Sequence, residues 1–378
     1  MVRIGIVAGE ASGDLLGSHL MQALKLKLPN VEFVGIAGPK MLREGAQSLF
    51  PMERLSVRGY VEVLKHLYGL LKLRRQLLAN FLNNPPDIFI GIDAPDFNFW
   101  LEKKLKANGI KTIHYVSPSI WAWRKGRIHN IKRSVTHMLA LFPFEPILYE
   151  NAGVPVTYVG HPLADMLPIV PNVAEARESL KIKFDALVIA MLPGSRQSEV
   201  NQHAALFIET AKRIFSVHPN AQFLVPLITR ETRQIFELAI FHELQPLPIQ
   251  ILFGHAHEAM AAADIIIVAS GTATLEAALL KKPMIITYRM PSLSWRIMKG
   301  MRLQPFVGLP NILAGKFVVP ELLQDESTPE KLADATNKLL ADKEYLAEIQ
   351  SEFTAIHHAL RQNTAEKAAA AILAQLNQ

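Results

Sequence analysis

The chain has 378 residues, of which 50% are hydrophobic and 20% charged, a composition that suits a globular protein of roughly two or three domains and excludes a disordered chain. Its 40 Lys and Arg against 34 Asp and Glu give a net charge of +6, a mild excess that argues against a nucleic-acid partner. The sequence has no cysteine, which excludes disulfides, thiolate metal sites and cysteine nucleophiles.

The first residues, Met1–Ala8, contain a short apolar run that ends at Gly9 and Glu10. This pattern predicts a first β-strand and not a signal peptide, which needs a longer apolar region. No apolar stretch reaches the roughly 18–20 residues that cross a bilayer. We therefore expect a cytoplasmic protein with at most peripheral membrane contact.

Short apolar runs alternate with helical patterns, as in parallel sheets covered by helices on both faces. The predicted strands of the first half are Arg3–Ala8, Glu32–Ile36, Asp87–Ile92, Lys111–Val116, His137–Ala140 and Thr157–Gly160. Those of the second half are Ala186–Leu192, Gln222–Pro226, Ile249–Phe253, Asp264–Ala269 and Pro283–Thr287. Three prolines between 162 and 171 mark the break, and about Thr328–Leu376 is predicted to be helical throughout. The sequence thus predicts an α/β protein with two Rossmann-like, doubly wound parallel-sheet domains.

Ligands of doubly wound sheets bind beyond the carboxyl ends of the strands. After the first strand, the small residues of Gly9–Asp14 allow a ligand to approach closely, or simply form a turn in which Ser12 or Asp14 caps the next helix. The G-x-G-x-x-G spacing is not met, and neither is that of a P-loop. A nicotinamide, flavin or P-loop nucleotide site is therefore disfavoured.

Two carboxylates, Asp93 and Asp96, follow the third strand. Either can act as a general base where burial raises its pKa toward the working pH. Asp93 is the preferred candidate because it lies closer to the strand end. Asp96 is an alternative base or a cap of the next helix.

Two tryptophans follow the fourth strand beside cations, in the segment His114–Lys125. Trp121 and Trp123, with Arg124 beside them, can hold an anionic, partly apolar ligand, although a lone Trp is usually a core residue. The histidines at 19, 114 and 161 are either ligand contacts or hydrogen-bonded structural residues.

Two turns of the second half predict a nucleotide diphosphate site. Leu192–Arg196 and Val268–Glu276 each follow an apolar strand and open a helix, whose N-terminus favours phosphate. Arg196 adds a bidentate phosphate partner, and Glu276 can accept hydrogen bonds from a ribose diol. The alternative is two ordinary helix starts with an acid in the first turn. No Asp-x-Asp pair is present, so we expect no metal, and helix ends and cations would meet the charge of a leaving group.

The segment Val61–Leu78 is basic and rich in leucine. With about 100° per residue, it gathers its apolar residues on one broad face. Such a helix suits an anionic membrane surface, and the alternative is a helix packed on the sheet. The predicted membrane contacts are Val61, Leu64, Leu67, Tyr68, Leu71 and Leu78. The region Tyr288–Phe306 is a second candidate lipid contact.

The motifs VAGEASGD, GIDAPDFN, HYVSPSIWAWR, LPGSR, ASGTATLEAAL and LPNILAG occur in this order from Val7 to Gly315. Together they closely resemble the lipid-A-disaccharide synthase family, inverting glycosyltransferases of the GT-B type. The resemblance implies an acceptor domain over 1–165, with the membrane-contact helix near 57–80, and a UDP-sugar domain over 166–345, with the active site between them. It also implies C-terminal helices over 346–378 that pack on the first domain or exchange in a homodimer.

The resemblance further implies a reaction without metal or cofactor. UDP-2,3-diacylglucosamine would donate its sugar to 2,3-diacylglucosamine 1-phosphate, giving UDP and a β(1→6) disaccharide on the path to lipid A. The enzyme would work at the anionic inner-membrane surface of a Gram-negative bacterium, with Asp93 as base. The acceptor-side candidates are Glu10, also counted as catalytic, with Ser12, Asn98, Ser117, Trp121, Trp123 and Arg124. The donor-side candidates are Ser195, Arg196, Ser270, Gly271, Thr272, Glu276 and Asn311.

Two other functions are compatible with these patterns. One is another GT-B enzyme that uses a UDP-N-acetylhexosamine, such as a peptidoglycan glycosyltransferase or a 2-epimerase. Its soluble substrate would not need the basic apolar helix. The other is a non-catalytic, membrane-associated protein that binds a nucleotide sugar.

Overall fold

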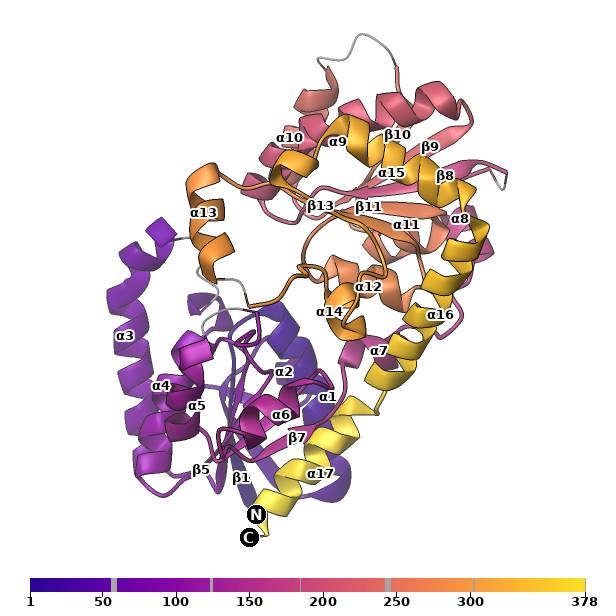
Figure 1. The fold of residues 1–378 in the computed structure, drawn as a ribbon. Coiled ribbons are helices and arrows are strands. Elements are labelled where there is room, and N and C mark those ends of the chain that lie inside the picture. The colour runs from indigo at the N-terminus through magenta and orange to yellow at the C-terminus, as the bar shows by residue number, and fades with distance from the viewer. Residues whose placement is uncertain (56–59, 123–124, 184, 242–245, 302, 378) are drawn as a thin grey trace. The chain divides into compact units, whose positions relative to one another are not determined.

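The computed structural model describes residues 1–55, 60–122, 125–183, 185–241, 246–301 and 303–377, with the backbone alone described at 60–67, 125, 293 and 297. By its internal contacts the chain divides into two compact units (Figure 1). The first unit is Met1–Asp165 together with Leu360–Gln378, and the second is Met166–Ala359. The segment 346–378, predicted as one C-terminal element, is therefore divided between the units.

The first unit contains a seven-stranded parallel sheet in the order β3-β2-β1-β4-β5-β6-β7. Its strands are β1 Val2–Ala8, β2 Val31–Ile36, β3 Gln47–Ser48, β4 Ile88–Ile92, β5 Lys111–Tyr115, β6 His137–Ala140 and β7 Val156–Tyr158. The six predicted strands are confirmed, whereas the short polar β3 was not predicted. Since β2 and β4 flank β1 on opposite sides, the strand order reverses beside β1, which is where such sheets bind ligands.

Helices cover both faces of this sheet. The helices of this unit are α1 Ala11–Lys27, α2 Pro39–Arg43, α3 Tyr60–Asn83, α4 Pro95–Ala107, α5 Ile128–Ser134, α6 Glu145–Glu150, α17 Thr364–Leu376 and α7 Pro162–Met166, the last of which ends in the second unit at Met166, with 3-10 turns η1 Met52–Arg54 and η2 Lys125–Arg127. Successive side chains of β4 point to opposite faces of the sheet. Ile90 packs with α1 and α17 on one face, whereas Phe89 packs with α3 and α4 on the other. The last helix of the chain thus completes the core of the first unit.

The second unit contains a six-stranded parallel sheet in the order β10-β9-β8-β11-β12-β13. Its strands are β8 Leu187–Leu192, β9 Ala221–Leu227, β10 Ile249–Phe253, β11 Ile265–Ala269, β12 Met284–Tyr288 and β13 Glu321–Leu323. The five predicted strands are confirmed, and the three-residue edge strand β13 was not predicted. The order of this sheet reverses between β8 and β11, so the two predicted phosphate turns lie side by side.

The remaining helices belong to the second unit, except for the end residue Leu360. They are α8 Val173–Ser179, α9 Gln197–Val217, α10 Arg230–Phe241, α11 Ala256–Ala262, α12 Ala273–Leu279, α13 Ser292–Met301, α14 Leu309–Ala314, α15 Pro329–Ala341 and α16 Lys343–Leu360, with the 3-10 turn η3 Gln324–Glu326. Among the residues described, no helix has the length and apolar character needed to span a membrane.

The second half of α3 packs on the sheet through Leu77 and Phe81, which are fully buried. Tyr68 points away from the core and is 80% exposed. Leu71 is half-buried, and Leu78 packs against the core. The side chains of the other three predicted membrane contacts, Val61, Leu64 and Leu67, lie outside the described residues.

Candidate active site

Two loops meet where the strand order of the first sheet reverses. A Cβ placed on Gly9, after β1, would lie 2.8 Å from the Cβ of Ala94, after β4. Glu10 and Asp93 flank this contact, and their carboxylates interact electrostatically. Asp93 and Ala94 both have left-handed backbones, with φ of 50° and 43°. Strain of this kind persists only where the surroundings enforce it and is frequent at active sites.

Hydrogen bonds hold the strained turn in place. The Asp93 N–H donates to the carbonyl of Tyr115 at 2.8 Å. From α4, the Asn98 amide donates to the carbonyl of Asp93 at 2.8 Å. Asn98 is fully buried, so the structure places it as a support of the turn that carries Asp93.

The two candidate bases have different environments. Burial raises the pKa of Asp93, as does Glu10 to a smaller extent, whereas His114 and the Ala94 N–H oppose this rise. The Asp96 side chain is 84% exposed and forms an ion pair with Arg127. The expectation that Asp96 caps α4 is wrong, since Ala94 occupies the N-cap position and no side chain caps it. A partly desolvated carboxylate with a raised pKa suits a general base, which favours Asp93.

A buried pair lies behind Asp93. Oε1 of Glu102, on α4, is 2.7 Å from Nδ1 of His114, on β5, and neither side chain is exposed. His114 is paired with Gly91, two residues before Asp93, so His114 and Asp93 belong to the same face of the sheet. A Cβ on Gly91 would lie 2.2 Å from Oε1 of Glu102, so only glycine leaves room for this carboxylate. Burial raises the pKa of Glu102, and the His114 ring opposes that rise.

The turn after β5 is held by a second buried acid. Trp121 donates its indole N–H to Oε1 of Glu145 at 3.2 Å, and the N–H groups of Leu141 and Phe142 donate to Oε2 at 3.0 Å each. Burial raises the pKa of Glu145 to about 7. Ser117 is 2.6 Å from the hydroxyl of Tyr149, a distance that joins β5 to α6. The other two candidates of this turn, Trp123 and Arg124, lie outside the described residues.

The loop after β1 differs from expectation in one respect. Asp14 is buried and accepts hydrogen bonds from the N–H groups of Lys40 and Met41, both at 2.9 Å. It therefore caps α2, and the expectation that it caps α1 is wrong. Ser12 is exposed in the first turn of α1, which begins at Ala11 without a side-chain cap.

The turn after β8 is organised by two residues of α9. The Glu199 carboxylate accepts hydrogen bonds from the N–H groups of Ser195 and Arg196, at 3.0 and 3.2 Å. The Arg196 side chain stays 70% exposed. His203 bonds the Pro193 carbonyl through Nδ1 at 2.9 Å and accepts from the Arg289 N–H through Nε2 at 3.0 Å. The histidine thus joins the ends of β8 and β12, and burial lowers its pKa.

The neighbouring turn follows β11 and leads into the helix that carries Glu276, the residue predicted to bind the ribose. Gly271 and Thr272 are exposed, and Ser270 donates its hydroxyl to the Val307 carbonyl at 3.2 Å. Glu276, in the first turn of α12, lies 2.7 Å from Nε2 of His257 on α11. This hydrogen bond raises the pKa of His257 and fixes the carboxylate.

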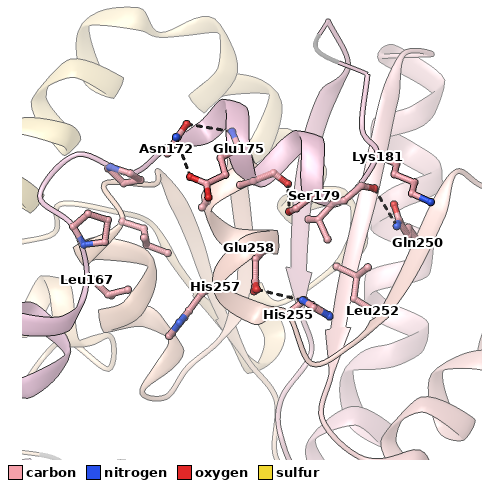
Figure 2. Close-up of a pocket in the computed structure, with 16 residues that line it drawn as sticks. Leu167, Asn172, Glu175, Ser179, Lys181, Gln250, Leu252, His255, His257 and Glu258 are labelled. Atoms are coloured by element: carbon pink, nitrogen blue, oxygen red, sulfur yellow. Dashed lines mark hydrogen bonds and ion pairs between the residues drawn. The ribbon is translucent and has the colours of Figure 1, made fainter.

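A cavity of about 700 Å³ begins at His257 (Figure 2). It lies between the residues around α8, the end of β10 and the start of α11. His255, which has a left-handed backbone with φ of 53°, lies 3.2 Å from Glu258 across its edge. The cavity shares His257 with the contact to Glu276, which is not among its lining residues.

Asn311 is fully buried and uses its amide inside the second unit. Its nitrogen donates to the Val319 carbonyl and to Glu321, both at 2.9 Å. Its oxygen accepts from the N–H groups of Val318 and Val319, at 2.8 and 3.0 Å. The structure therefore places Asn311 as a support of the loop before β13.

Four supporting residues were absent from the predicted site: Glu102, Glu145, His203 and His257. Glu102, His203 and His257 each contact a residue from a distant part of the chain, so no local motif contains both partners. Glu102 did carry a signal, because it follows Asn98 by four residues on the buried side of α4, among apolar neighbours. A carboxylate at such a position needs a buried partner.

Comparison with known proteins gives a consistent result. A family model described as "Lipid-A-disaccharide synthetase" matches residues 4–375. Proteins named lipid-A-disaccharide synthase are similar over nearly the whole chain: that of Methylobacillus flagellatus is 67% identical, with 99% of both chains covered, and that of Aromatoleum aromaticum is 58% identical, with 99% of this chain and 96% of the other covered.

Solved structures agree at the level of the fold. The glycosyltransferase of kitacinnamycin has a TM-score of 0.64 at 15% identity, covering 99% of this chain and 98% of the other. A UDP-GlcNAc 2-epimerase from Neisseria meningitidis, bound to UDP-GlcNAc, has a TM-score of 0.61 at 12% identity, covering 100% and 99%. The chain thus has the GT-B fold of two Rossmann-like units, as predicted.

Proposed function

The chain belongs to the lipid-A-disaccharide synthetase family, and from this premise we propose how it makes the disaccharide of lipid A. The donor is UDP-2,3-diacylglucosamine and the acceptor is 2,3-diacylglucosamine 1-phosphate. The products are UDP and a β(1→6)-linked disaccharide 1-phosphate.

Asp93 carries the proposed mechanism. Its carboxylate takes the proton of the acceptor 6-hydroxyl while the hydroxyl oxygen bonds to the anomeric carbon of the donor. The bond from that carbon to the diphosphate breaks, and its electron pair leaves with UDP. Attack opposite the leaving group inverts the anomeric centre. The partly buried position and raised pKa of Asp93, at the reversal of the strand order, are the observations that support this role.

The remaining candidates position the two substrates. Glu10, Ser12, Ser117 and Trp121 are assigned to the acceptor, together with Trp123 and Arg124 from outside the described residues. Ser195, Arg196 and the turn Ser270–Thr272 are assigned to the diphosphate, where N–H groups and a cation stabilise negative charge without a metal. Glu276 is assigned to the ribose, held ready by His257. Asn311 supports the donor side through the backbone that it anchors.

Acylated substrates imply a membrane surface. We assign the protein to peripheral contact with the cytoplasmic face of the inner membrane through α3. The exposed Tyr68 and half-buried Leu71 support this contact, whereas Leu78 belongs to the core. In the structure α17 packs on α1 of its own chain, and its exchange within a homodimer stays a prediction.

The function is tested by incubating the protein with both substrates and measuring UDP release and disaccharide. UDP should appear only when both are present. Release of UDP without the acceptor, or conversion of a UDP-N-acetylhexosamine alone, would support another GT-B activity, and no release would support a non-catalytic protein.

The base is tested by Asp93→Ala against Asp96→Ala. We expect the first to lower kcat by about 10²–10⁴-fold and the second to keep turnover within about fivefold, because an exposed ion pair contributes little. Near-normal turnover of Asp93→Ala with loss in Asp96→Ala would refute the assignment.

A further inference from the structure

A second cavity, of about 260 Å³, lies in the first unit between α3, α4, the end of η2 and α5. Three cations line it, Arg74, Lys103 and Arg127, against one carboxylate, Asp96, which leaves a net charge of +2 (three minus one). At ~30 Å³ per water, the space equals roughly nine water molecules, which is ample for a phosphate group.

Arg74 lines this cavity and forms no ion pair with any residue that the structure describes. Its guanidinium carbon lies 4.1 Å from the centroid of the Trp100 ring, and Nη1 is 3.5 Å from the main-chain oxygen of Asp96. Its Nε is buried and has no hydrogen-bond partner among the described residues. Burial and the neighbouring Arg75 lower the pKa of Arg74, so the charged form is poorly compensated. A bound anion would satisfy this unpaired donor.

The single carboxylate of the cavity is already engaged. Asp96 forms its ion pair with Arg127. Lys103 is exposed and forms no ion pair within the described part of the chain. Two of the three cations, Arg74 and Lys103, therefore remain for an external anion.

The cavity starts close to the proposed base, since Pro95 and Asp96 line it and Asp93 directly precedes Ala94. In a glucosamine 1-phosphate, the 6-hydroxymethyl group and the phosphate branch from the two carbons beside the ring oxygen, so a base and a phosphate site for one such sugar must be near each other. We propose that this cavity binds the phosphate group of the acceptor, with Arg74 and Lys103 as its ligands. This assignment rests on the proposed function.

Kinetics of Arg74→Gln and Lys103→Gln test the assignment, with the adjacent exposed residues as matched controls, Arg75→Gln and Lys104→Gln. We expect the KM for the phosphorylated acceptor to rise about tenfold or more in the first two, because a hydrogen bond to a charged group is lost. Their kcat and donor KM should stay within about twofold, and both controls should match the wild type. Arg74→Lys, which keeps the charge without the planar fork, should be intermediate.

The source of the phosphate is tested with an acceptor that lacks it. On diacylglucosamine the wild type and Arg74→Gln should have equal KM values, because the lost contact is then absent in both. An equal loss on both acceptors would overturn the proposal. So would an unchanged acceptor KM with weaker sedimentation on phosphatidylglycerol vesicles, which would assign the cavity to a phospholipid headgroup.

Calorimetric titration with glucosamine 1-phosphate measures binding to the cavity independently of the glycosyl transfer. The wild type and Arg75→Gln should bind the ligand, whereas Arg74→Gln with an unchanged Tm should lose at least tenfold in affinity. If glucosamine 1-phosphate binds as expected but the substrate pair releases no UDP, the proposed function is wrong and the assignment of the cavity to a phosphate group is kept. If UDP is released but Arg74→Gln binds normally, the cavity assignment alone is wrong.

Discussion

Replacing Glu102 tests whether the buried Glu102–His114 pair serves the base or only the fold. Both side chains are fully buried, and their N and O atoms are 2.7 Å apart. Removing one partner of such a pair costs about 3–5 kcal/mol, because the other keeps its desolvation cost without compensation. For a unit of this size, 1 kcal/mol lowers Tm by about 2–4 °C. Glu102→Ala should therefore lower the Tm of the first unit by about 10 °C.

Glu102→Gln separates charge from packing. The amide is isosteric and keeps a hydrogen bond to His114, so the loss is the difference between a charge-assisted and a neutral bond, about 1 kcal/mol. The His114 ring interacts with both carboxylates, so loss of the Glu102 carboxylate should weaken the effect by which His114 opposes the raised pKa of Asp93. Asp93 works as a base only when deprotonated. The acid limb of the profile of kcat/KM against pH should therefore move to higher pH.

The assay is kcat/KM from about pH 5 to pH 9, with Tm measured on the same samples. Glu102→Gln should lose activity at the acid end and regain it at the alkaline end, and His114→Gln should shift the limb in the same direction. Glu145→Gln is the control, since Glu145 is another buried acid of this unit but does not act on Asp93. An acid limb that stays in place in both Glu102→Gln and His114→Gln would refute the reasoning and leave the pair a purely structural role.

Two further predictions concern other parts of the first unit. Burial raises the pKa of Glu145 to about 7 from 4.5, so its protonated form stabilises the fold at low pH, and about 3 kcal/mol is lost as pH rises through 7. Thermal melts of Glu145→Gln, which stays neutral, should show a flatter decline of Tm than the wild type between about pH 5 and pH 8, and parallel curves would contradict this. On α3, Tyr68→Ser and Leu71→Ser should weaken sedimentation with anionic vesicles and spare activity on detergent-dispersed substrate, whereas Leu77→Ala should cost about 2–5 kcal/mol of stability. Unchanged vesicle binding of both serine variants would argue against membrane contact through these residues.

The sheets could be predicted because parallel strands buried on both faces are continuous apolar runs. The two strands that were missed, β3 and β13, lie at sheet edges and have only two and three residues. Neither contains the apolar run that signals a buried strand. Each forms by pairing its backbone with the edge of a neighbouring strand. Their existence therefore depends on tertiary pairing, which sequence pattern does not contain.

The site could be predicted only in part, for the same reason. Asp93 and Glu276 were proposed as site residues because each lies just beyond a strand end, and the structure places them there. The supports behind them come from other elements, as Glu102 and His257 do. The capping expectation for Asp14 is wrong because a carboxylate binds whichever helix start lies within reach, and α2 is brought there by the fold.

The histidines illustrate the difference between residues that support the loops and a residue that acts on the proposed base. Burial lowers the pKa of both His203 and His161, that of His161 to about 4. His203 joins the ends of β8 and β12, and His161 accepts a hydrogen bond from the N–H of Leu163. His257 is hydrogen-bonded to Glu276, which raises the pKa of His257. Only His114, of these four, acts electrostatically on the Asp93 carboxylate. The acid limb of kcat/KM should therefore move when His114 is replaced and stay in place when His203 or His257 is replaced. Its position would then report the charge state of Asp93, because the other histidines hold the loops.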